Sequence, residues 1–509
     1  MPRPTHSAYL PALNTTPLPL DQRLLRTLAY NLVPVADSDS YGAFQAKYWA
    51  DPAAFMRECI LWPNPQRSIT DYQAEIAQSI LTKKRVSVRG PHGLGKSTLA
   101  ALLTLWFALT RDGRDWKIIT TASAWRQLES YLWPEIHKWI ARLDWTRIGR
   151  PPLVDGREVL QLSLKLDTGQ AFGVASNNHL YIEGAHADHL FYIFDEAKAI
   201  PAATWDAAEG AFSGAGDDLD HEALALAIST PGEPTGRFYD IHARRPGLED
   251  WYVRHVKLEE SIAAGRISRT WADQRKALWG ETSALYQNRV LGEFAEQAAD
   301  TVIPLAWVEK ANDRWSDWVK ADKPGRFICV GVDVGRGGDR SVFAKRYEAD
   351  TVKAIDDLLY ESAADTMVVA GRVKGILDKY GGQAVVDVIG IGAGVVDRLR
   401  EQEYTVTPFN AGERAEGQDK SGELGFVNKR SHGWWNLREL LDPNGPDAVA
   451  LPPDDLLTGD LCAPRWKATS GGRIQVESKD TIKERLGRST DSGDAVMMAF
   501  ASEGTWWVW

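Results

Sequence analysis

The chain has 509 residues, of which 44% are hydrophobic and 25% charged, so it is long enough for two to four domains with separate cores. Its 59 basic and 69 acidic residues give a net charge of −10, which excludes a polybasic DNA coat but not a local basic groove. The three cysteines form no CxxC pair, so we expect neither a disulfide framework nor a cysteine zinc site.

The N-terminal half reads as an arm followed by a parallel α/β domain. Residues 1–40 have no helical or strand period and predict an arm. Beyond them, helical stretches alternate with short β-branched strands, a rhythm typical of a parallel α/β sheet. We expect this first domain to cover residues 41–295. The predicted strands are Arg85–Val88, Lys117–Thr121, Leu190–Phe194 and Ala223–Ile228.

The C-terminal half predicts a second α/β domain. A segment with glycine, proline and several acids suggests a junction over residues 296–322, followed by a domain over residues 323–509. Its expected elements are strands at Phe327–Val334, Ser341–Tyr347 and Gln383–Val388, and a helix over residues 364–380. No apolar run is long enough to span a bilayer, so we expect a soluble protein without a membrane partner, in a reducing cytoplasm.

One loop carries a strong nucleotide-binding signal. The sequence Gly90-Pro-His-Gly-Leu-Gly95-Lys96-Ser97 matches GxxxxGK[ST] in full, between a predicted strand and an apolar helix. In such a loop the backbone N–H groups at Gly90, Gly93 and Gly95 surround phosphates, the lysine reaches the β and γ oxygens, and the serine hydroxyl coordinates Mg²⁺. Lys96, Ser97 and the adjacent Thr98 are therefore candidate nucleotide contacts.

Further candidates come from other segments. The apolar strand Leu190–Phe194 ends in Asp195 and Glu196, which predicts a water-mediated Mg²⁺ ligand and a residue that polarises the attacking water. A turn at the strand end is required for both carboxylates to be used. Ser229 and Thr230 end another strand, where small hydroxyls can sense a γ-phosphate. Gln73 is a candidate adenine contact.

Acidic residues at strand and helix ends predict a second site. Asp333 and Asp387 each lie in an otherwise apolar strand, and Asp491 and Asp494 are three apart at a helix start. Isolated buried carboxylates are costly unless they bind something, and hard oxygen ligands suit Mg²⁺ or Mn²⁺. Two such ions about 3.5–4 Å apart would support phosphodiester cleavage.

Taken together, these motifs resemble the large terminase subunit of tailed bacteriophages, the motor and nuclease that packages DNA into procapsids. The resemblance extends over roughly residues 60–505. Beyond the phosphate loop and the carboxylates, it rests on residues 121–127, 182–187, 195–197, 291–294, 302–307, 426–430, 477–480 and 485–489.

The resemblance implies an N-terminal P-loop ATPase domain of the ASCE, RecA-like type and a C-terminal nuclease domain of ribonuclease-H-like fold. It implies ATP and Mg²⁺ in the first domain, with Gln73 at the adenine, Lys96 and Ser97 at the phosphates, Asp195 and Glu196 as the Walker B pair, and Ser229 and Thr230 in a coupling motif. It implies two Mg²⁺ or Mn²⁺ ions on Asp333, Asp387, Asp491 and Asp494, with Asp494 favoured over Asp491.

Two departures from the family pattern stand out. Many relatives carry an arginine inside the phosphate loop, where this chain has Pro91 and His92. Arg89, just before the loop, or an arginine of a neighbouring subunit is the candidate replacement. The family's Ser-Pro-Asp before the last acid is here Ser489-Thr490-Asp491, which keeps the carboxylate.

The implied partners are double-stranded DNA, the portal protein of the procapsid and a small terminase subunit, in the cytoplasm of an infected bacterium and not in the mature virion. Because the chain has one phosphate loop, a second wall of the ATP site must come from another copy, which favours a homo-oligomeric ring during packaging, from a subunit that can be monomeric in solution. The cations Arg473, Lys479, Lys483, Arg485 and Arg488 mark a candidate DNA path or a solvated helix face.

Two other functions compete with packaging. A helicase-nuclease acting outside packaging would need a second RecA-like domain with an arginine-rich motif, and the sequence after residue 300 contains none. A non-enzymatic, ATP-gated DNA-binding protein would need neither Glu196 nor the strand-borne acids. The Trp-rich tail, Trp506, Trp507 and Trp509, is either core or a docking segment for a capsid partner.

Overall fold

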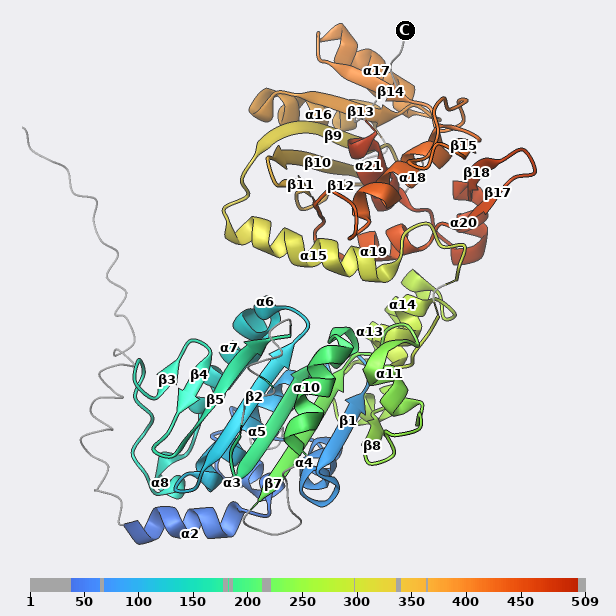
Figure 1. Ribbon diagram of the computed structural model, residues 1–509. Coiled ribbons are helices and arrows are strands. Elements are labelled where there is room, and N and C mark those ends of the chain that lie inside the picture. Colours follow the sequence, from blue (N-terminus) through green and yellow to red (C-terminus); the bar gives the residue numbers. More distant parts are fainter. Residues whose placement is uncertain are drawn as a thin grey trace, which may run out of the picture. The chain divides into compact units, whose positions relative to one another are not determined.

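The computed structural model describes residues 38–64, 68–176, 182, 186–212, 221–296, 298–335, 340–362 and 365–501 (Figure 1). Residues 1–37 of the predicted arm and the Trp-rich tail lie outside the described residues. The chain divides into two units, which we describe separately. The first consists of Met1–Arg89, Gly93–Thr230 and Thr235–Arg266, and the second of Gly90–His92, Pro231–Pro234 and Ile267–Trp509.

The first unit alternates strands and helices as predicted, and each predicted strand is present within one or two residues of its expected bounds. Its strands are β1 (Arg85–Arg89), β2 (Trp116–Ala122), β3 (Val159–Leu160), β4 (Ser163–Lys165), β5 (Gly169–Ala175), β6 (His189–Asp195), β7 (Glu222–Ser229) and β8 (Tyr252–His255). Its helices are α2 (Ser38–Tyr48), α3 (Pro52–Glu58), α4 (Asp71–Lys83), α5 (Lys96–Arg111), α6 (Trp125–Gln127), η2 (Leu128–Leu132), α7 (Trp133–Ile140), α8 (Trp145–Ile148), η3 (Ala197–Ala199), α10 (Ala202–Phe212), α11 (Gly236–His242) and α12 (Leu258–Ala263).

These strands form an eight-stranded sheet in the order β3-β4-β5-β2-β6-β7-β1-β8. The strands from β5 to β8 in this order run parallel, and only the β3-β4-β5 edge is antiparallel. Strand β7 lies between β1, which leads into the phosphate loop, and β6, which ends in the acidic pair. An extra strand at this position is the hallmark of the ASCE class of P-loop ATPase folds, so the predicted fold of the first unit is confirmed.

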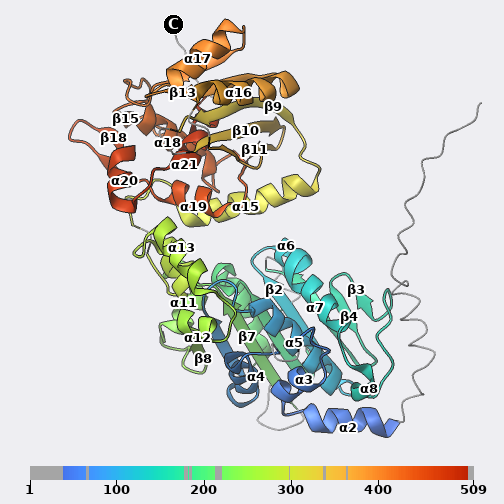
Figure 2. The same ribbon diagram turned by 180° about the vertical axis from the view of Figure 1, so that it is seen from behind.

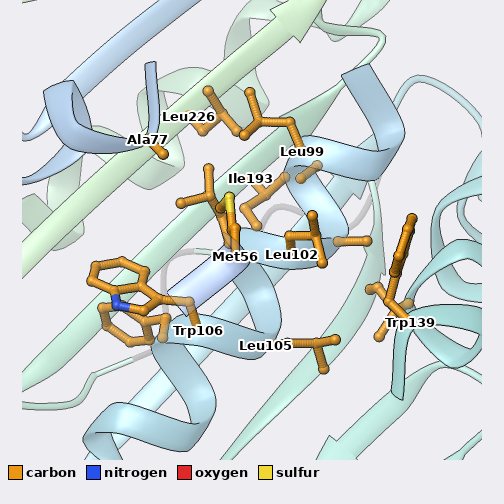
Figure 3. Packing of buried hydrophobic residues seen from close by; sticks show 14 of the residues in the cluster. Met56, Ala77, Leu99, Leu102, Leu105, Trp106, Trp139, Ile193 and Leu226 are labelled. Carbon is orange, nitrogen blue, oxygen red and sulfur yellow. The ribbon is translucent and has the colours of Figure 1, made fainter. Parts of the chain in front are cut away.

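The core of the first unit lies between the sheet and the helix α5, whose side chains are apolar on nearly every face. Leu99 and Leu102 of this helix lie beside Ile193 of β6, as Figure 3 shows, and Leu105 belongs to the same buried cluster. On the other face, Trp205 of α10 stacks on Phe194, with ring centroids 4.3 Å apart. Helices on both faces explain why the central strands read as continuous apolar runs.

A buried ion-pair network lies where β6 and β7 begin. The Arg111 guanidinium donates to both carboxylate oxygens of Glu222 at 2.7 and 3.2 Å, and its plane lies over the ring of Trp49. The ring nitrogen Nδ1 of His189 lies 3.1 Å from the same carboxylate. Burial alone would raise the pKa of Glu222, but the hydrogen bond from His189 and the charge of Arg111 lower it to about 2.

The second unit contains the predicted α/β elements of the C-terminal half. Its strands are β9 (Arg326–Asp333), β10 (Ser341–Ala349), β11 (Val352–Ile355), β12 (Leu359–Glu361), β13 (Gln383–Asp387), β14 (Val406–Phe409), β15 (Gly425–Phe426), β16 (Val449–Ala450), β17 (Trp466–Ala468) and β18 (Arg473–Val476). Its helices are α13 (Arg269–Trp279), α14 (Ala284–Tyr286), η4 (Gln287–Leu291), α15 (Leu305–Lys320), α16 (Thr366–Tyr380), α17 (Gly392–Glu401), α18 (Lys429–Leu441), α19 (Asp455–Cys462), α20 (Lys479–Leu486) and α21 (Asp491–Phe500).

The main sheet of the second unit has the order β14-β13-β9-β10-β11-β16, with β12 paired to β10. Strands β9, β10 and β11 form an antiparallel meander, and β13 and β14 are added parallel to β9. This is the strand order of a ribonuclease-H-like fold, so the fold predicted for the second half is confirmed. Residues 305–320, inside the predicted junction, form helix α15, which packs on this sheet through α15–β16 and α15–β11 contacts.

Helices cover both faces of this sheet, as Figure 2 shows from behind: α16 and α17 lie on one face, and α18 and α21 on the other. Helix α21 packs directly on β9. A Cβ atom added at Gly331 of β9 would meet the carbonyl oxygen of Ala495 at 2.1 Å and the amide nitrogen of Ala499 at 2.6 Å. Glycine therefore permits the close approach that brings the first turn of α21 to the end of β9.

A small sheet in the order β15-β18-β17 completes the second unit. In the part of the chain that the structure describes, each helix is too short or too polar to cross a membrane.

Candidate nucleotide and metal sites

The phosphate loop connects β1 to α5 with the backbone geometry that anion binding requires. Gly93 and Gly95 have φ angles of +86° and +85°, in the left-handed region that favours glycine. Gly95 is the N-cap of the 16-residue helix α5, whose first N–H groups have no intrahelical partners. The N-terminus of such a helix is suited to bind phosphate.

Lys96 is almost fully buried at the start of α5. Its ammonium donates to the Thr230 hydroxyl at 2.7 Å, just beyond the end of β7. Burial lowers the pKa of Lys96, and the charges of Glu196 and Asp195 oppose this shift. The structure thus brings together four residues that were predicted from separate segments of the sequence.

The acidic pair at the end of β6 has the turn that was expected. Glu196 has a φ of +46°, an unusual backbone conformation for a residue with a side chain. At this positive φ the chain leaves the extended strand conformation, in which successive side chains point to opposite faces. The Glu196 carboxylate accepts a hydrogen bond from the Ser229 hydroxyl at 3.1 Å. Asp195 is 3% exposed, and burial, together with the charge of Glu196, raises its pKa to about 7.

The Gln73 side chain is buried beside the phosphate loop. Its Oε1 accepts from the Thr70 amide at 3.0 Å, forming a capping box with the Thr70 hydroxyl, and from Arg266 at 3.4 Å. Its Nε2 donates to the Gly95 carbonyl at 3.2 Å. The amide therefore ties α4 to the loop, and both ends of it already have protein partners.

A cavity of about 700 Å³ lies next to Gln73, within the first unit. Residues 68–72 at the start of α4 line one part of it, and residues 263–266 another. Arg254 and Glu260 contribute charged groups, and they form an ion pair with each other. A cavity of this size can hold a nucleoside base.

The remaining nucleotide candidates have other surroundings. The Thr98 hydroxyl donates to Glu135 of α7 at 2.7 Å, while Ser97 is half-buried at the start of α5. Arg89 is half-buried at the end of β1. Burial, together with the positive charge of Arg89, lowers the pKa of His242 to about 3, so the two side chains are close enough for their charges to interact.

The predicted carboxylates of the second unit gather at one edge of its sheet. Asp333 is the last residue of β9 and Asp387 the last of β13, and these strands are adjacent and parallel. Asp491 and Asp494 lie in the first turn of α21. Burial raises the pKa of both Asp333 and Asp387, and the charge of Lys479 opposes each shift.

Lys479, at the start of α20, lies among three of these carboxylates. Its ammonium is 2.7 Å from an oxygen of Asp333 and 3.3 Å from oxygens of Asp491 and Asp494. Burial alone would lower the pKa of Lys479, but the three negative charges raise it. A cation is thus held at the point where the acids converge.

Asp494 is held rigidly by neighbouring side chains. Its oxygens accept hydrogen bonds from the Trp434 indole at 2.9 Å, from the Thr490 hydroxyl at 3.0 Å and from the Arg430 guanidinium. Burial alone would raise the pKa of Asp494, but the charges of Arg430 and Lys479 lower it overall. The Asp491 side chain is 25% exposed, more than that of Asp494 at 3%.

The donor chemistry of this carboxylate cluster fits a divalent cation, because three of its acids already surround an ammonium. As the side chains stand, however, no group of three or more acidic, histidine or cysteine side chains among the described residues is arranged to hold a metal ion. The position between the acids is taken by Lys479. Binding of an ion would therefore require this ammonium to move.

Arg430 and Trp434 were not predicted as site residues, and Lys479 was predicted only as part of a DNA path and not as a partner of the carboxylates. The motifs at 426–430 and 477–480 contained two of them, but only the fold brings these segments to the first turn of α21. Arg430 and Trp434 lie on α18, about 60 residues before Asp494 in sequence. The available signal was that Arg430 and Lys479 are basic residues within these two motifs.

The two strand orders, one with a phosphate loop and one with a carboxylate edge, define a P-loop ATPase fold joined to a ribonuclease-H-like nuclease fold. The chain is similar in sequence to a probable large terminase subunit of Enterobacteria phage P7, with 28% identity over 268 residues, 50% of this chain and 51% of that protein. This match confirms the resemblance seen in the motifs. The chain spans about half the length of the curated relative it matches. No protein-family model matches it.

Two solved structures are similar in fold. The large terminase of a thermophilic bacteriophage is 13% identical, with a TM-score of 0.40, and the match covers 84% of this chain and 98% of that one. The nuclease domain of the large terminase subunit gp2 of bacterial virus Sf6 is 20% identical, with a TM-score of 0.34, and the match covers 40% of this chain and 99% of that one.

Proposed function

We propose that the chain is the large terminase subunit of a tailed bacteriophage, which hydrolyses ATP to drive double-stranded DNA into procapsids and cleaves concatemeric DNA. The observation that carries this proposal is that one chain combines a phosphate loop facing an acidic pair with a separate carboxylate cluster on a second sheet. The sequence similarity to a probable large terminase subunit supports the same conclusion. The ATPase domain is proposed over residues 41–295 and the nuclease domain over residues 323–509, joined by residues 296–322.

In the ATPase domain, the loop glycines and the N-terminus of α5 would bind the phosphates of ATP. Ser97 would hold Mg²⁺ directly and Asp195 through water, and the ion would neutralise phosphate charge. Lys96 is desolvated, so its charge acts strongly on the β and γ oxygens. Glu196 orients and polarises the attacking water. Ser229 positions Glu196, and Thr230 contacts Lys96 until phosphate competes for that ammonium. The cavity beside Gln73 accommodates the adenine.

In the nuclease domain, Asp333, Asp387, Asp491 and Asp494 would hold two Mg²⁺ or Mn²⁺ ions, which activate water and stabilise the leaving oxygen of a phosphodiester. The oxygens of Asp494 are already occupied by Trp434, Thr490 and Arg430. Asp491 accepts hydrogen bonds from Ser489 and Lys479 through Oδ1 and is 25% exposed, which favours Asp491, rather than Asp494, as the ligand that is open to an ion. When ions are absent, Lys479 neutralises the carboxylates. Once ions displace its ammonium, Lys479 can contact the DNA phosphate.

The partners follow from this function. Double-stranded DNA is the substrate of both domains, the portal of a procapsid is the docking site, and a small terminase subunit selects the DNA. The subunit acts in the cytoplasm of the infected bacterium. Several copies form a ring during packaging, so that a neighbouring subunit supplies the second wall of each ATP site. The arginine at the γ-phosphate is either Arg89 of the same chain or an arginine of that neighbouring subunit.

The proposal is tested with purified protein, linear DNA, ATP and procapsids. We expect the wild type to protect DNA from added nuclease only when procapsids and ATP are both present. Lys96→Ala and Glu196→Gln should each lower ATP hydrolysis by about a hundredfold or more and abolish protection, with Mg²⁺-dependent cleavage retained. The exposed Lys47→Ala is the matched control. ATP-dependent DNA unwinding that needs no procapsid would instead support a helicase-nuclease.

The nuclease assignment is tested separately on plasmid DNA. Asp333→Ala and Asp387→Ala should each lose cleavage and keep ATP hydrolysis. Full cleavage by both variants would refute the proposed nuclease site, and an unchanged ATPase rate in Glu196→Gln would refute the proposed role of that glutamate.

A further inference from the structure

Asp460 is a buried carboxylate that the proposed mechanism does not use. It lies on α19 and is 1% exposed. One of its oxygens, Oδ2, accepts hydrogen bonds from the backbone amides of Ser492 at 2.9 Å and Gly493 at 3.2 Å. These amides lie in the first turn of α21, between the two acids Asp491 and Asp494. The Asp460 carboxylate thus binds the helical turn that carries Asp491 and Asp494, two of the four candidate metal ligands.

The contact fills a gap in the capping of α21. The first N–H groups of a helix have no intrahelical partners and normally bond to the side chain of the N-cap residue. Thr490 is the N-cap of α21 but makes no capping hydrogen bond: its hydroxyl donates to Asp494 at 3.0 Å and accepts from the Arg430 guanidinium at 3.4 Å. Asp460 supplies the missing acceptor from another helix.

The charge of Asp460 is balanced by Arg488, which forms an ion pair with its second oxygen, Oδ1. The same guanidinium donates to the carbonyl of Ser489 at 3.0 Å and to that of Leu278, on α13, at 2.9 Å. A buried carboxylate is costly unless it is both paired and hydrogen-bonded, and Asp460 is both. The arrangement therefore fixes the approach to α21 from residue 488 onward.

We propose that Asp460 is a positioning residue of the nuclease site, which holds the first turn of α21 so that the Asp491 carboxylate faces Asp333. The proposal rests on the nuclease function proposed above. Asp460 touches none of the four candidate metal ligands through its side chain and acts through two backbone amides. Its loss frees the amides, lets the turn fray and weakens the binding of divalent ions. Groups that orient metal ligands in this way typically contribute about 10–100-fold to metal affinity.

The test measures Mn²⁺ binding directly, by titration calorimetry of the full-length protein, together with the Mn²⁺ concentration that gives half-maximal plasmid cleavage. Asp460→Ala should weaken Mn²⁺ binding about tenfold or more. Asp460→Asn keeps an oxygen acceptor for the two amides but loses the ion pair with Arg488, so it should lower the melting temperature and yet keep Mn²⁺ binding within about threefold of wild type. ATP hydrolysis, which depends on the other domain, should be unchanged in both variants.

Asp356→Ala is the matched control, because Asp356 is also a buried acid, paired with Lys345, in the same unit. It should lower the melting temperature without changing Mn²⁺ affinity. Wild-type Mn²⁺ affinity in Asp460→Ala would overturn the positioning role and leave Asp460 as a stabilising residue only. If that variant does not fold, Asp460→Glu replaces it: its displaced carboxylate should weaken Mn²⁺ binding several-fold, and unchanged binding would overturn the role. A wild type that neither binds Mn²⁺ nor cleaves DNA would refute the nuclease function itself, and the positioning role with it.

Discussion

Replacing Lys479 by methionine should destabilise the metal-free protein and strengthen its binding of divalent ions. The substitution keeps a long apolar side chain but removes the ammonium that three carboxylates share. Without this charge, Asp333, Asp491 and Asp494 repel one another in a largely buried setting. Added Mn²⁺ can then supply the missing positive charge without competing with the lysine.

The contact distances give the size of the effect. At an effective dielectric constant of about 20, opposite unit charges 2.7 Å apart attract by about 6 kcal/mol and those 3.3 Å apart by about 5 kcal/mol. Desolvation offsets most of this gross attraction, and breaking a buried ion pair typically costs about 3–5 kcal/mol. Because the Lys479 side chain is 30% exposed, we take the lower end, about 3 kcal/mol. For a domain of this size that lowers the melting temperature by about 6–12 °C.

The assay is thermal unfolding by calorimetry, with and without saturating Mn²⁺. Tenfold tighter ion binding would return about 1.4 kcal/mol to the variant, so Mn²⁺ should raise its melting temperature more than that of the wild type. Lys345→Met is the control, since it removes a buried lysine whose partner, Asp356, lies outside the cluster. A loss below about 1 kcal/mol, or equal Mn²⁺ shifts in variant and wild type, would refute the reasoning.

Three further predictions concern other residues. Gly95→Ala places a Cβ at a positive φ and 2.7 Å from the Gln73 amide nitrogen, so it should lower the free energy of unfolding by about 1–2 kcal/mol. It should also weaken ATP binding at least tenfold in a fluorescent-nucleotide titration, and unchanged affinity would contradict the proposed loop geometry. Gly331→Ala should push α21 off β9, cost about 1–3 kcal/mol and abolish cleavage while sparing ATP hydrolysis, and a fully active nuclease would count against the close packing. Glu222, with a pKa lowered from 4.5 to about 2, contributes about 3 kcal/mol above pH 4.5, which is lost as the pH falls toward 2. Urea unfolding at several pH values should therefore give Glu222→Gln a flatter acid limb, and a limb as steep as that of the wild type would exclude this role.

The fold was largely predictable because its signals are local. Apolar β-branched runs identified the main strands, and their alternation with helices predicted a parallel sheet, whereas the order of the strands came only from the structure. Asp333 and Asp387 could be proposed for one site because each is a carboxylate in an apolar strand, where a charge is costly unless it binds something. Their adjacency on parallel strands came from the structure. Helix α15, residues 305–320, was not predicted, because the glycine and proline before it led us to interpret these residues as part of the junction.

Side-chain partners were not predictable, because they depend on contacts between distant segments. Nothing near Lys479 in sequence indicates that its ammonium lies among three carboxylates. Gln73 was predicted as an adenine contact, and that role stays a prediction. Its hydrogen bond to the Gly95 carbonyl joins α4 to the phosphate loop, so the sequence of α4 alone does not predict it.

The pairing of β13 with β9 has a consequence for how the proposed nuclease site can vary. Val386 pairs with Val332, so Asp387 and Asp333 extend the same ladder by one step, and their backbones are separated by the fixed spacing between strands, about 4.8 Å. No loop length or side-chain choice can change this spacing without breaking the sheet. Helix α21 has no such ladder, and its first turn is held instead by side-chain contacts from Asp460, Arg430 and Trp434. The sheet therefore fixes the separation of Asp333 and Asp387, whereas the positions of Asp491 and Asp494 depend on side chains that substitution can change. Variants with an altered metal preference are therefore to be sought around α21.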